Sequence, residues 1–230
     1  MRQLTPIDRY RSPDDLPKRI ALFPLRGVIL LPRADLPLNV FEPRYLSLVT
    51  DVLSGNRIVG IIQPETTSGV PESPQGRSVP LKRIGCAGRL TAYRELADGR
   101  FHITLTGVAR FVVQNEADSS EPYRLADVGY DKYSLDLADD ESAEEIDREA
   151  LLGVLKAFLA TRRLQADWDA VERAPLEPLI NGLSLMSPFG PEERQALLEA
   201  ENLSERAKIL MTLAEMAIAG GDMDDGGRMQ

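Results

Sequence analysis

The 230-residue sequence has one cysteine and one histidine, and this scarcity excludes several kinds of site. Cys86 alone cannot form an internal disulfide framework or a multi-cysteine zinc site. His102 alone cannot supply a two-histidine metal site and leaves few options for a general base. The patterns around them favour a small buried side chain for Cys86 and an exposed strand residue for His102. We therefore expect neither a metal site nor a cofactor.

Long hydrophobic runs and nucleotide-binding or hydrolase motifs are also missing. No apolar run approaches the ~18 to 20 residues of a membrane span. The N-terminal stretch MRQLTPIDRYRSP lacks the apolar core of a secretory signal. No glycine is followed by lysine, which excludes a P-loop, and no G-x-S-x-G motif is present. These absences predict a cytoplasmic protein that is not an enzyme and has no membrane segment.

Positive charge is scarce in the second half of the chain. Residues 1–133 contain 18 Lys and Arg against 15 Asp and Glu, a net charge of +3, whereas residues 134–230 contain 9 against 21, a net charge of −12. Such asymmetry indicates two units with different surfaces. An acidic protein repels phosphate backbones, so nucleic acid is an unlikely partner.

Between residues 19 and 133 the pattern is mostly that of strands, after a polar segment, residues 1–18, that reads as a flexible arm. Short apolar runs at 20–22, 28–31, 57–63 and 123–130 read as strands, and the proline-rich stretch 64–80 as a long surface loop. The clearest signal is a hairpin joined at Asp98-Gly99, a pair that suits a type I′ turn. About seven short strands without long helices between them predict a closed or nearly closed barrel.

Residues 134–219 have helical spacing instead. Ser142 and Glu145 form a potential capping box, and the apolar positions that follow predict a first helix. Similar patterns at 176–186, after Pro191 and after Asn202 predict a bundle of about four helices, followed by a disordered tail over 220–230. The expected fold class is α+β, a β-barrel followed by a C-terminal helical bundle.

The stretch LPLNVFEPRY, residues 36–45, alternates like a strand and then changes to helical spacing. Pro43 suits the first position of a helix, and Glu42 lies where the helix dipole favours negative charge. Arg44 has two interpretations. It could form an ion pair with Glu42 or Asp51, or it could project into a groove and bind a carboxylate or carbonyl of a peptide.

Three longer segments together resemble one family: FPLRGVILLPRADLPLNVFEPRYLSLV, RIVGIIQP and IGCAGRLTAYRELADGRFHITLTGVARFVV. They resemble the substrate-binding domain of the Lon proteases, and most of all its standalone bacterial form. The segment LINGLSLMSPFGPEERQALLEA is similar to the helical part of that form. The likeness extends over residues 19–219. The ATPase module and the Ser–Lys protease module of full-length Lon have no counterpart in these 230 residues.

The resemblance implies a PUA-like barrel and a non-catalytic role in polypeptide recognition, as a proteolysis adaptor or a chaperone-like factor. The implied partners are unfolded or flexible polypeptides and an ATP-dependent protease. Candidate binding residues are Phe41 and Arg44 at the joint and Val70 in the 64–80 loop, with an extended peptide added to a strand edge. The alternative is a PUA-like RNA-binding protein, which would require a basic stripe on one barrel face, formed by Arg83, Arg89, Arg94, Arg100 and Arg110.

Overall fold

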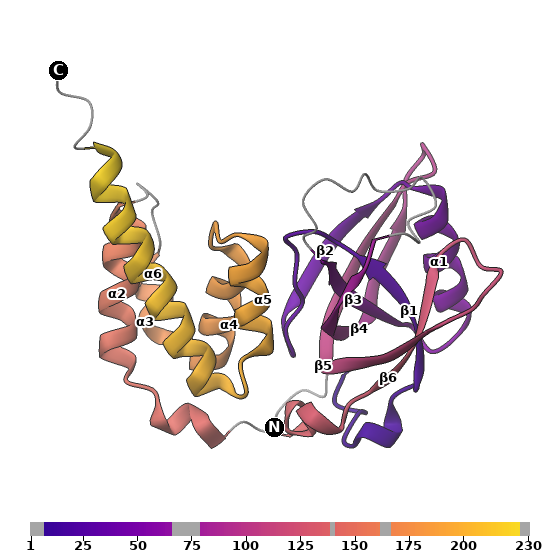
Figure 1. Cartoon of the computed structure of the whole chain (residues 1–230), viewed down its shortest axis with the longest axis horizontal. Coiled ribbons are helices and arrows are strands. Elements are labelled where there is room, and N and C mark those ends of the chain that lie inside the picture. The colour runs from indigo at the N-terminus through magenta and orange to yellow at the C-terminus, as the bar shows by residue number, and fades with distance from the viewer. Residues whose placement is uncertain (1–6, 66–78, 139–140, 162–166, 226–230) are drawn as a thin grey trace. The chain divides into compact units, whose positions relative to one another are not determined.

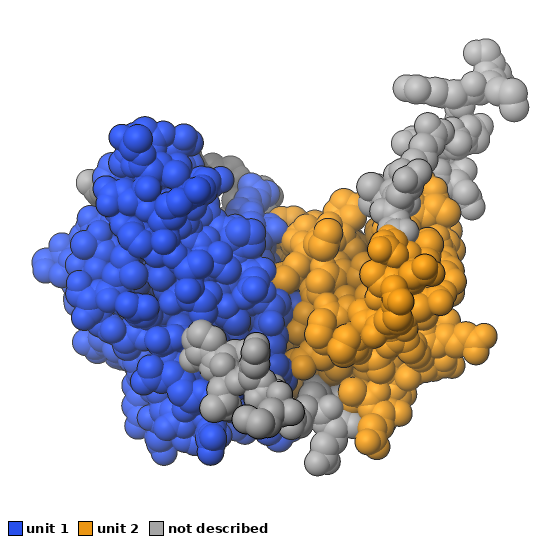
Figure 2. Space-filling model, turned by 180° about the vertical axis from the view of Figure 1, so that it is seen from behind, with its two compact units in different colours: residues 1–139 blue, residues 140–230 orange. Residues whose placement is uncertain are grey.

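The computed structural model describes residues 7–65, 79–138, 141–161 and 167–225. The chain forms two compact units, residues 1–139 and 140–230 (Figures 1 and 2). The first is a β-barrel with one α-helix and the second is helical, so the predicted α+β class is confirmed. The boundary lies at 139/140 rather than at 133/134, because the segment after the last strand is bound to the barrel. There Arg110 and Asp136 form a buried ion pair with an Nη2–Oδ1 distance of 2.7 Å.

The barrel unit begins with a short 3₁₀ helix and ends with another. Its elements in chain order are η1 (Pro13–Asp15), β1 (Arg19–Pro24), β2 (Asp35–Val40), α1 (Pro43–Ser54), β3 (Ile58–Pro64), β4 (Leu81–Glu95), β5 (Phe101–Ala117), β6 (Arg124–Gly129) and η2 (Asp131–Leu137).

Pairing of β5 with β6 closes the sheet into a ring. The strand order is β2-β5-β4-β3-β1-β6, and the additional β5–β6 pairing closes the five strands from β5 to β6 into a ring, with β2 outside it. Strand β5 can do this because it is 17 residues long. Its first half pairs with β2 and its last part with β6, while β4 lies along its other side. The expected barrel is therefore confirmed, and the described residues form six strands rather than about seven, five in the ring and β2 outside it.

Glycines allow the ring to close tightly. The register of β4 and β5 shifts between Ala87 and Gly88, which marks a bulge. A Cβ at Gly88 would lie 2.6 Å from a methyl carbon of Leu30, and one at Gly85 would lie 2.6 Å from the Ile61 carbonyl oxygen. Both glycines thus serve close packing of the barrel, beside the fully buried Cys86.

Residues 28–31 and residues 7–18 differ from their prediction, because both segments place apolar side chains in the core without forming a strand. Residues 28–31 form no strand, yet Ile29, Leu30 and Leu31 are all buried. A short apolar run looks alike whether it is a strand or an irregular core segment. Residues 7–18 are not a free arm either, because Tyr10 and Leu16 belong to the core of the barrel.

The β4–β5 hairpin is confirmed, but its turn is not type I′. The Gly99 N–H donates to the Leu96 carbonyl at 2.9 Å, and the Leu96 N–H donates to the Arg100 carbonyl at 2.8 Å. Only Gly99 has a positive φ, +81°, whereas a type I′ turn requires Asp98 to have one too. The loop is therefore the three-residue kind, with glycine in the left-handed position.

In the helical unit the elements are η3 (Glu141–Glu145), α2 (Arg148–Thr161), α3 (Trp168–Arg173), α4 (Leu176–Met186), α5 (Pro191–Glu199) and α6 (Leu203–Asp225). The described part thus has five α-helices rather than about four, and α6 continues into the predicted tail. None of the helices in the described ranges combines the length and apolar character needed to cross a membrane.

The first long helix does not start at the predicted capping box. Residues 141–145 form a 3₁₀ helix, and α2 begins only at Arg148. Asp147 caps α2 instead, since its Oδ1 accepts a hydrogen bond from the Ala150 N–H at 3.0 Å. Aspartate is as good an N-cap as serine. Where several acidic or hydroxyl residues lie close together, the sequence therefore does not determine at which of them the helix begins.

Candidate functional site

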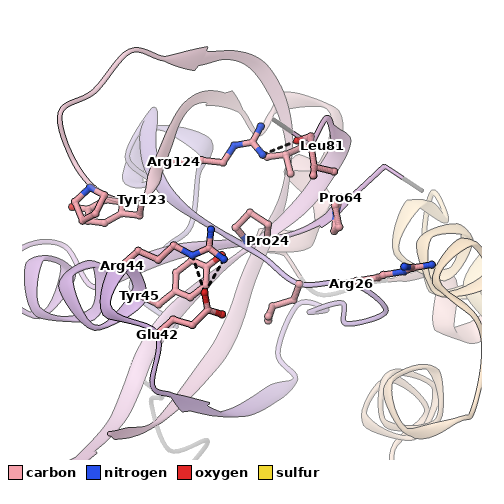
Figure 3. Close-up of a pocket in the computed structure, with 12 residues that line it drawn as sticks. Pro24, Arg26, Glu42, Arg44, Tyr45, Pro64, Leu81, Tyr123 and Arg124 are labelled. Carbon is pink, nitrogen blue, oxygen red and sulfur yellow. Dashed lines mark hydrogen bonds and ion pairs between the residues drawn. The ribbon is translucent and has the colours of Figure 1, made fainter. Parts of the chain in front are cut away.

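A pocket of about 180 Å³ opens on the barrel unit where the strand-to-helix joint meets the ends of several strands (Figure 3). The described residues that line it combine prolines, tyrosines and arginines with one glutamate. They are Pro24, Leu25, Arg26, Glu42, Arg44, Tyr45, Pro64, Val79, Leu81, Pro122, Tyr123 and Arg124.

Strand pairing brings these separate segments together. Strands β1 and β3 are parallel, so their C-terminal ends, Pro24 and Pro64, come to the same side of the barrel. Pro64 is in turn the partner of Leu81 at the start of β4. Prolines suit these positions because a strand end needs no further ladder hydrogen bond. The floor of the pocket is therefore rigid main chain with apolar side chains.

The joint supplies one wall of the pocket, and this wall contains Arg44. Pro43 is the first residue of α1 and Glu42 is its N-cap. The Arg44 guanidinium binds the Glu42 carboxylate, with Nε–Oε2 2.9 Å and Nη2–Oε2 2.7 Å. It also lies 4.6 Å from the centre of the Tyr45 ring, which stacks on Phe23 at 4.0 Å. The ion pair with Glu42 is thus confirmed, and the same arginine lines a pocket.

The opposite wall comes from the end of the segment before β6 and from Arg124, the first residue of that strand. Arg124 is buried and binds Glu116 of β5, with an Nε–Oε2 distance of 2.7 Å, and its Nη1 donates to the Val79 carbonyl at 2.8 Å. In Figure 3 Arg44 and Arg124 lie on two sides of the pocket, with Pro24 between them. Because each is paired with a carboxylate, the two arginines leave little net charge in the pocket.

Tyr123 fixes this wall to helix α1. Its hydroxyl donates to the Asp51 carboxylate at 2.7 Å. Burial first, and then the hydrogen bond to Asp51, raise the pKa of the Tyr123 phenol above its usual range. The phenol therefore stays protonated and acts as a fixed donor rather than as an acid or base. Asp51, the other predicted partner of Arg44, is used by Tyr123 instead.

The three predicted binding residues have different outcomes. Arg44 lines the pocket. Phe41 does not, but it lies next to it in the chain and is 64% exposed, which is unusual for a phenylalanine. Val70 lies outside the described residues. The pocket is partly polar, since three arginines and a glutamate belong to its lining.

Sequence reasoning missed Tyr123 and Arg124, although the chain contains a signal for them. Glu42-Pro-Arg-Tyr45 and Glu121-Pro-Tyr-Arg124 have the same composition with the last two residues exchanged, and three residues of each line this pocket. A pair of tetrapeptides of this kind is visible without a structure. What the sequence does not show is that strand pairing brings the two copies together.

Two features expected elsewhere on the barrel can also be placed. The basic stripe proposed for RNA binding does not form, because Arg110 is buried against Asp136 and Arg100 is paired with Asp98 at 2.7 Å. His102 is half-buried, and its Nδ1 lies 3.2 Å from Nη2 of Arg94. Within the described ranges no three His, Cys, Asp or Glu side chains are grouped to hold a metal ion.

The helical unit has a larger groove of about 610 Å³ that the sequence did not indicate. Helices α2, α3 and α4 form it, and none of the described residues that line it is charged. The lining residues are Phe158, Leu159, Ala170, Val171, Ala174, Pro178, Leu179, Gly182, Leu183, Met186, Ser187 and Pro188. Met186 is 85% exposed at this groove.

Comparison with known families agrees with this architecture. The family model of the ATP-dependent protease La (Lon) substrate-binding domain matches residues 19–215. The chain belongs to this family. The match covers both the barrel unit and most of the helical unit.

Curated relatives of the Lon family are much longer than this chain. The Lon protease of Flavobacterium johnsoniae is 27% identical over 227 residues, which cover 94% of this chain but 26% of that protein. The Lon protease of Desulfosudis oleivorans is 30% identical over 110 residues, 48% of this chain and 13% of that protein. The chain spans about a quarter of the first of these relatives, so the similarity concerns the substrate-binding domain alone.

Solved Lon N-terminal domains share the fold. A Lon N-terminal domain protein from Xanthomonas campestris aligns with a TM-score of 0.56 at 24% identity, covering 84% of this chain and 97% of its own. The N-terminal domain of the Mycobacterium avium complex Lon protease aligns with a TM-score of 0.60 at 16% identity, covering 86% and 98%. At these identities the structures support the α+β architecture and not a particular ligand.

Proposed function

We propose that this protein is a non-catalytic polypeptide-recognition factor that binds unfolded or flexible segments through its barrel unit. Family membership supports a substrate-recognition role. The single observation that carries the proposal is the pocket beside Phe41, which offers prolines and tyrosines to apolar side chains. We place the protein in the cytoplasm, as an adaptor that delivers clients to an ATP-dependent protease or as a chaperone-like factor.

The pocket chemistry suits a peptide more than a charged ligand. Arg44 keeps its Nη1 without a partner in the described part of the chain, while its other two nitrogens bind Glu42. One guanidinium N–H of a residue that lines the pocket can donate to a main-chain carbonyl of a client. Because ordering a flexible client costs several kcal/mol, we expect affinities of about micromolar or weaker.

A titration at two salt concentrations tests this function. A reduced and alkylated model protein, which cannot refold, is added to the purified chain at low and at high salt. We expect weak binding that changes little with salt, since burial and main-chain hydrogen bonds dominate. Single-stranded RNA, titrated in parallel, should not bind. Salt-sensitive RNA binding without polypeptide binding would contradict the proposal, because phosphate contacts weaken steeply as salt increases.

A further inference from the structure

Strand β2 is the outer strand of the barrel's sheet. It pairs with β5 on one side, and no other strand of the described chain lies on its other side. Every second residue of such a strand turns its main-chain N–H and C=O away from the partner. These outward groups can accept another extended chain.

Pro37 identifies which residues of β2 face outward. Pro37 is opposite Thr104 in the register, but it has no N–H to give. The Thr104 carbonyl accepts a hydrogen bond from Thr91 Oγ1 at 3.3 Å, so it points toward β4 and not toward β2. Pro37 and Thr104 are therefore a pair without mutual hydrogen bonds. It follows that Asp35, Pro37 and Asn39 direct their main-chain groups outward.

Along this outer edge of β2, every outward-facing main-chain group except the missing N–H of Pro37 is available for hydrogen bonding. Asp35 and Asn39 each offer one N–H and one C=O, and Pro37 offers one C=O. All three residues are exposed, and no hydrogen bond to another described residue is recorded for these five groups. Phe41, which is also exposed, comes directly after the end of β2, and Glu42 and Arg44 of the pocket follow. The open edge of β2, the Phe41 side chain and the pocket residues Glu42 and Arg44 thus follow one another along the chain.

We propose that a client polypeptide binds as an added strand along the outer edge of β2, with Phe41 and the pocket receiving its next side chains. This proposal rests on the proposed function and names the binding mode. Main-chain pairing does not depend on client sequence, which suits a factor with many clients. On one face of β2, Leu36 and Leu38 are half-buried, while Pro37 and Asn39 on the other face are exposed. The preferred client is therefore an extended segment that alternates apolar and polar residues.

Pro37 also indicates that the strand added to this edge belongs to a client and not to a second copy of this chain. In a symmetric antiparallel pair of β2 strands centred on Pro37, the two prolines would face each other and form no hydrogen bond. Both Pro37 carbonyls would remain unpaired, which is costly away from water. A client residue other than proline supplies the N–H that Pro37 needs. Proline on an edge strand is a known obstacle to self-association.

A pair of variants at one position separates main-chain pairing from side-chain effects. Asn39→Pro removes one outward N–H, and the presence of Pro37 shows that this edge tolerates proline. Asn39→Thr changes the side chain and keeps the N–H. We expect Asn39→Pro to bind the alkylated model protein about tenfold more weakly, the worth of one hydrogen bond. Asn39→Thr should bind like the parent chain.

Residue-resolved amide exchange on the unmodified full-length chain gives a second test that does not depend on a variant folding. With the client bound, the amides of Asp35 and Asn39 should exchange more slowly, while those of Leu36 and Leu38, already paired with β5, should change little. Client binding with no protection of Asp35 and Asn39, or with equal affinity of Asn39→Pro, would overturn the edge proposal and leave the proposed function intact. Protection of these amides by self-association alone would also overturn it. No client binding by the parent chain would refute both.

Discussion

The arginine side chains of the two units bind different kinds of partner. In the barrel unit Arg19, Arg44, Arg110 and Arg124 each bind a carboxylate. In the helical unit the guanidinium groups bind main-chain carbonyls: Arg148 those of Val171, Glu172 and Ala174, and Arg194 those of Leu185, Ser187 and Phe189.

The difference follows from the backbone. In the barrel the strands satisfy many of one another's carbonyls, so these four arginines pair with acidic side chains, and Arg124 donates in addition to the Val79 carbonyl, which lies outside the strands. Helices leave their last four carbonyls without a partner, and an arginine can fill that need. Acidic side chains of the helical unit are then not required for pairing. Residues 140–230 carry 9 Lys and Arg against 19 Asp and Glu, while residues 1–139 carry 18 against 17. The acidic surface of the second unit is thus compatible with its internal structure.

The largest expected effect is on the barrel. Arg110→Ala leaves Asp136 as an unpaired carboxylate in a site where both side chains are almost fully buried. We expect a loss of about 3 to 5 kcal/mol in the free energy of unfolding. Denaturant unfolding followed by circular dichroism of the sheet measures it. The double change Arg110→Met with Asp136→Asn should restore most of the loss, because the asparagine oxygen can still accept the hydrogen bond from the main-chain N–H of residue 110. Failure to restore it would mean that the pair does more than neutralise charge.

A smaller effect is expected in the helical unit. Arg194→Met removes three hydrogen bonds from a charged group to carbonyls, at 2.7, 2.7 and 3.0 Å. We expect a loss of about 2 kcal/mol, because hydrogen bonds to charged groups contribute more than neutral ones. Trp168 is the single tryptophan of the chain, so its fluorescence reports unfolding of this unit. Arg194→Lys should lose nearly as much, since one ammonium cannot reach all three carbonyls. Full rescue by lysine would show that only the charge matters.

The hairpin turn gives an effect of about 1 kcal/mol in the barrel alone. Gly99 has φ +81°, and no other residue lies within 4 Å of a Cβ built there. Gly99→Val therefore acts through backbone strain and not through a clash. Gly99→Asn, which tolerates this conformation, should cost less. If valine and asparagine lower the melting temperature equally, the strain argument is wrong.

The smallest effect is a dependence on pH that only the barrel should show. Hydrogen bonds from Arg19 and Asn115 lower the pKa of Asp127 to about 2. A lowered pKa gives stability that is complete above the unfolded pKa of about 3.9 and is lost as the pH falls through about 2. The difference in melting temperature between the parent and Asp127→Asn should therefore be constant at neutral pH and disappear near pH 2. An Arg148→Met variant should show no such trend, since carbonyls do not titrate in this range.

Local patterns predicted the main strands and helices, apart from the segments corrected above, but not the pocket. The alternation in β5 and the proline at the start of α1 determine those elements over a few residues. In contrast, Tyr123 contacts Asp51 across 72 positions of the chain, and Arg124 contacts Val79 across 45. Such contacts depend on which strands pair, and no short pattern contains that information. The prediction of a type I′ turn was wrong because the loop has three residues instead of two. One extra residue changes which loop positions need a positive φ.

The central claim is that flexible polypeptides bind to the barrel unit and not to the apolar groove of the helical unit. Phe41 and Met186 are large exposed apolar residues, one in each unit, with exposed fractions of 64% and 85%. A photoreactive amino acid placed at either position of the full-length chain tests both surfaces in the same way. We expect a high yield of crosslinks to an alkylated model protein from position 41 and a low yield from position 186. Strong crosslinking from position 186 with none from position 41 would contradict the account and assign recognition to the helical unit.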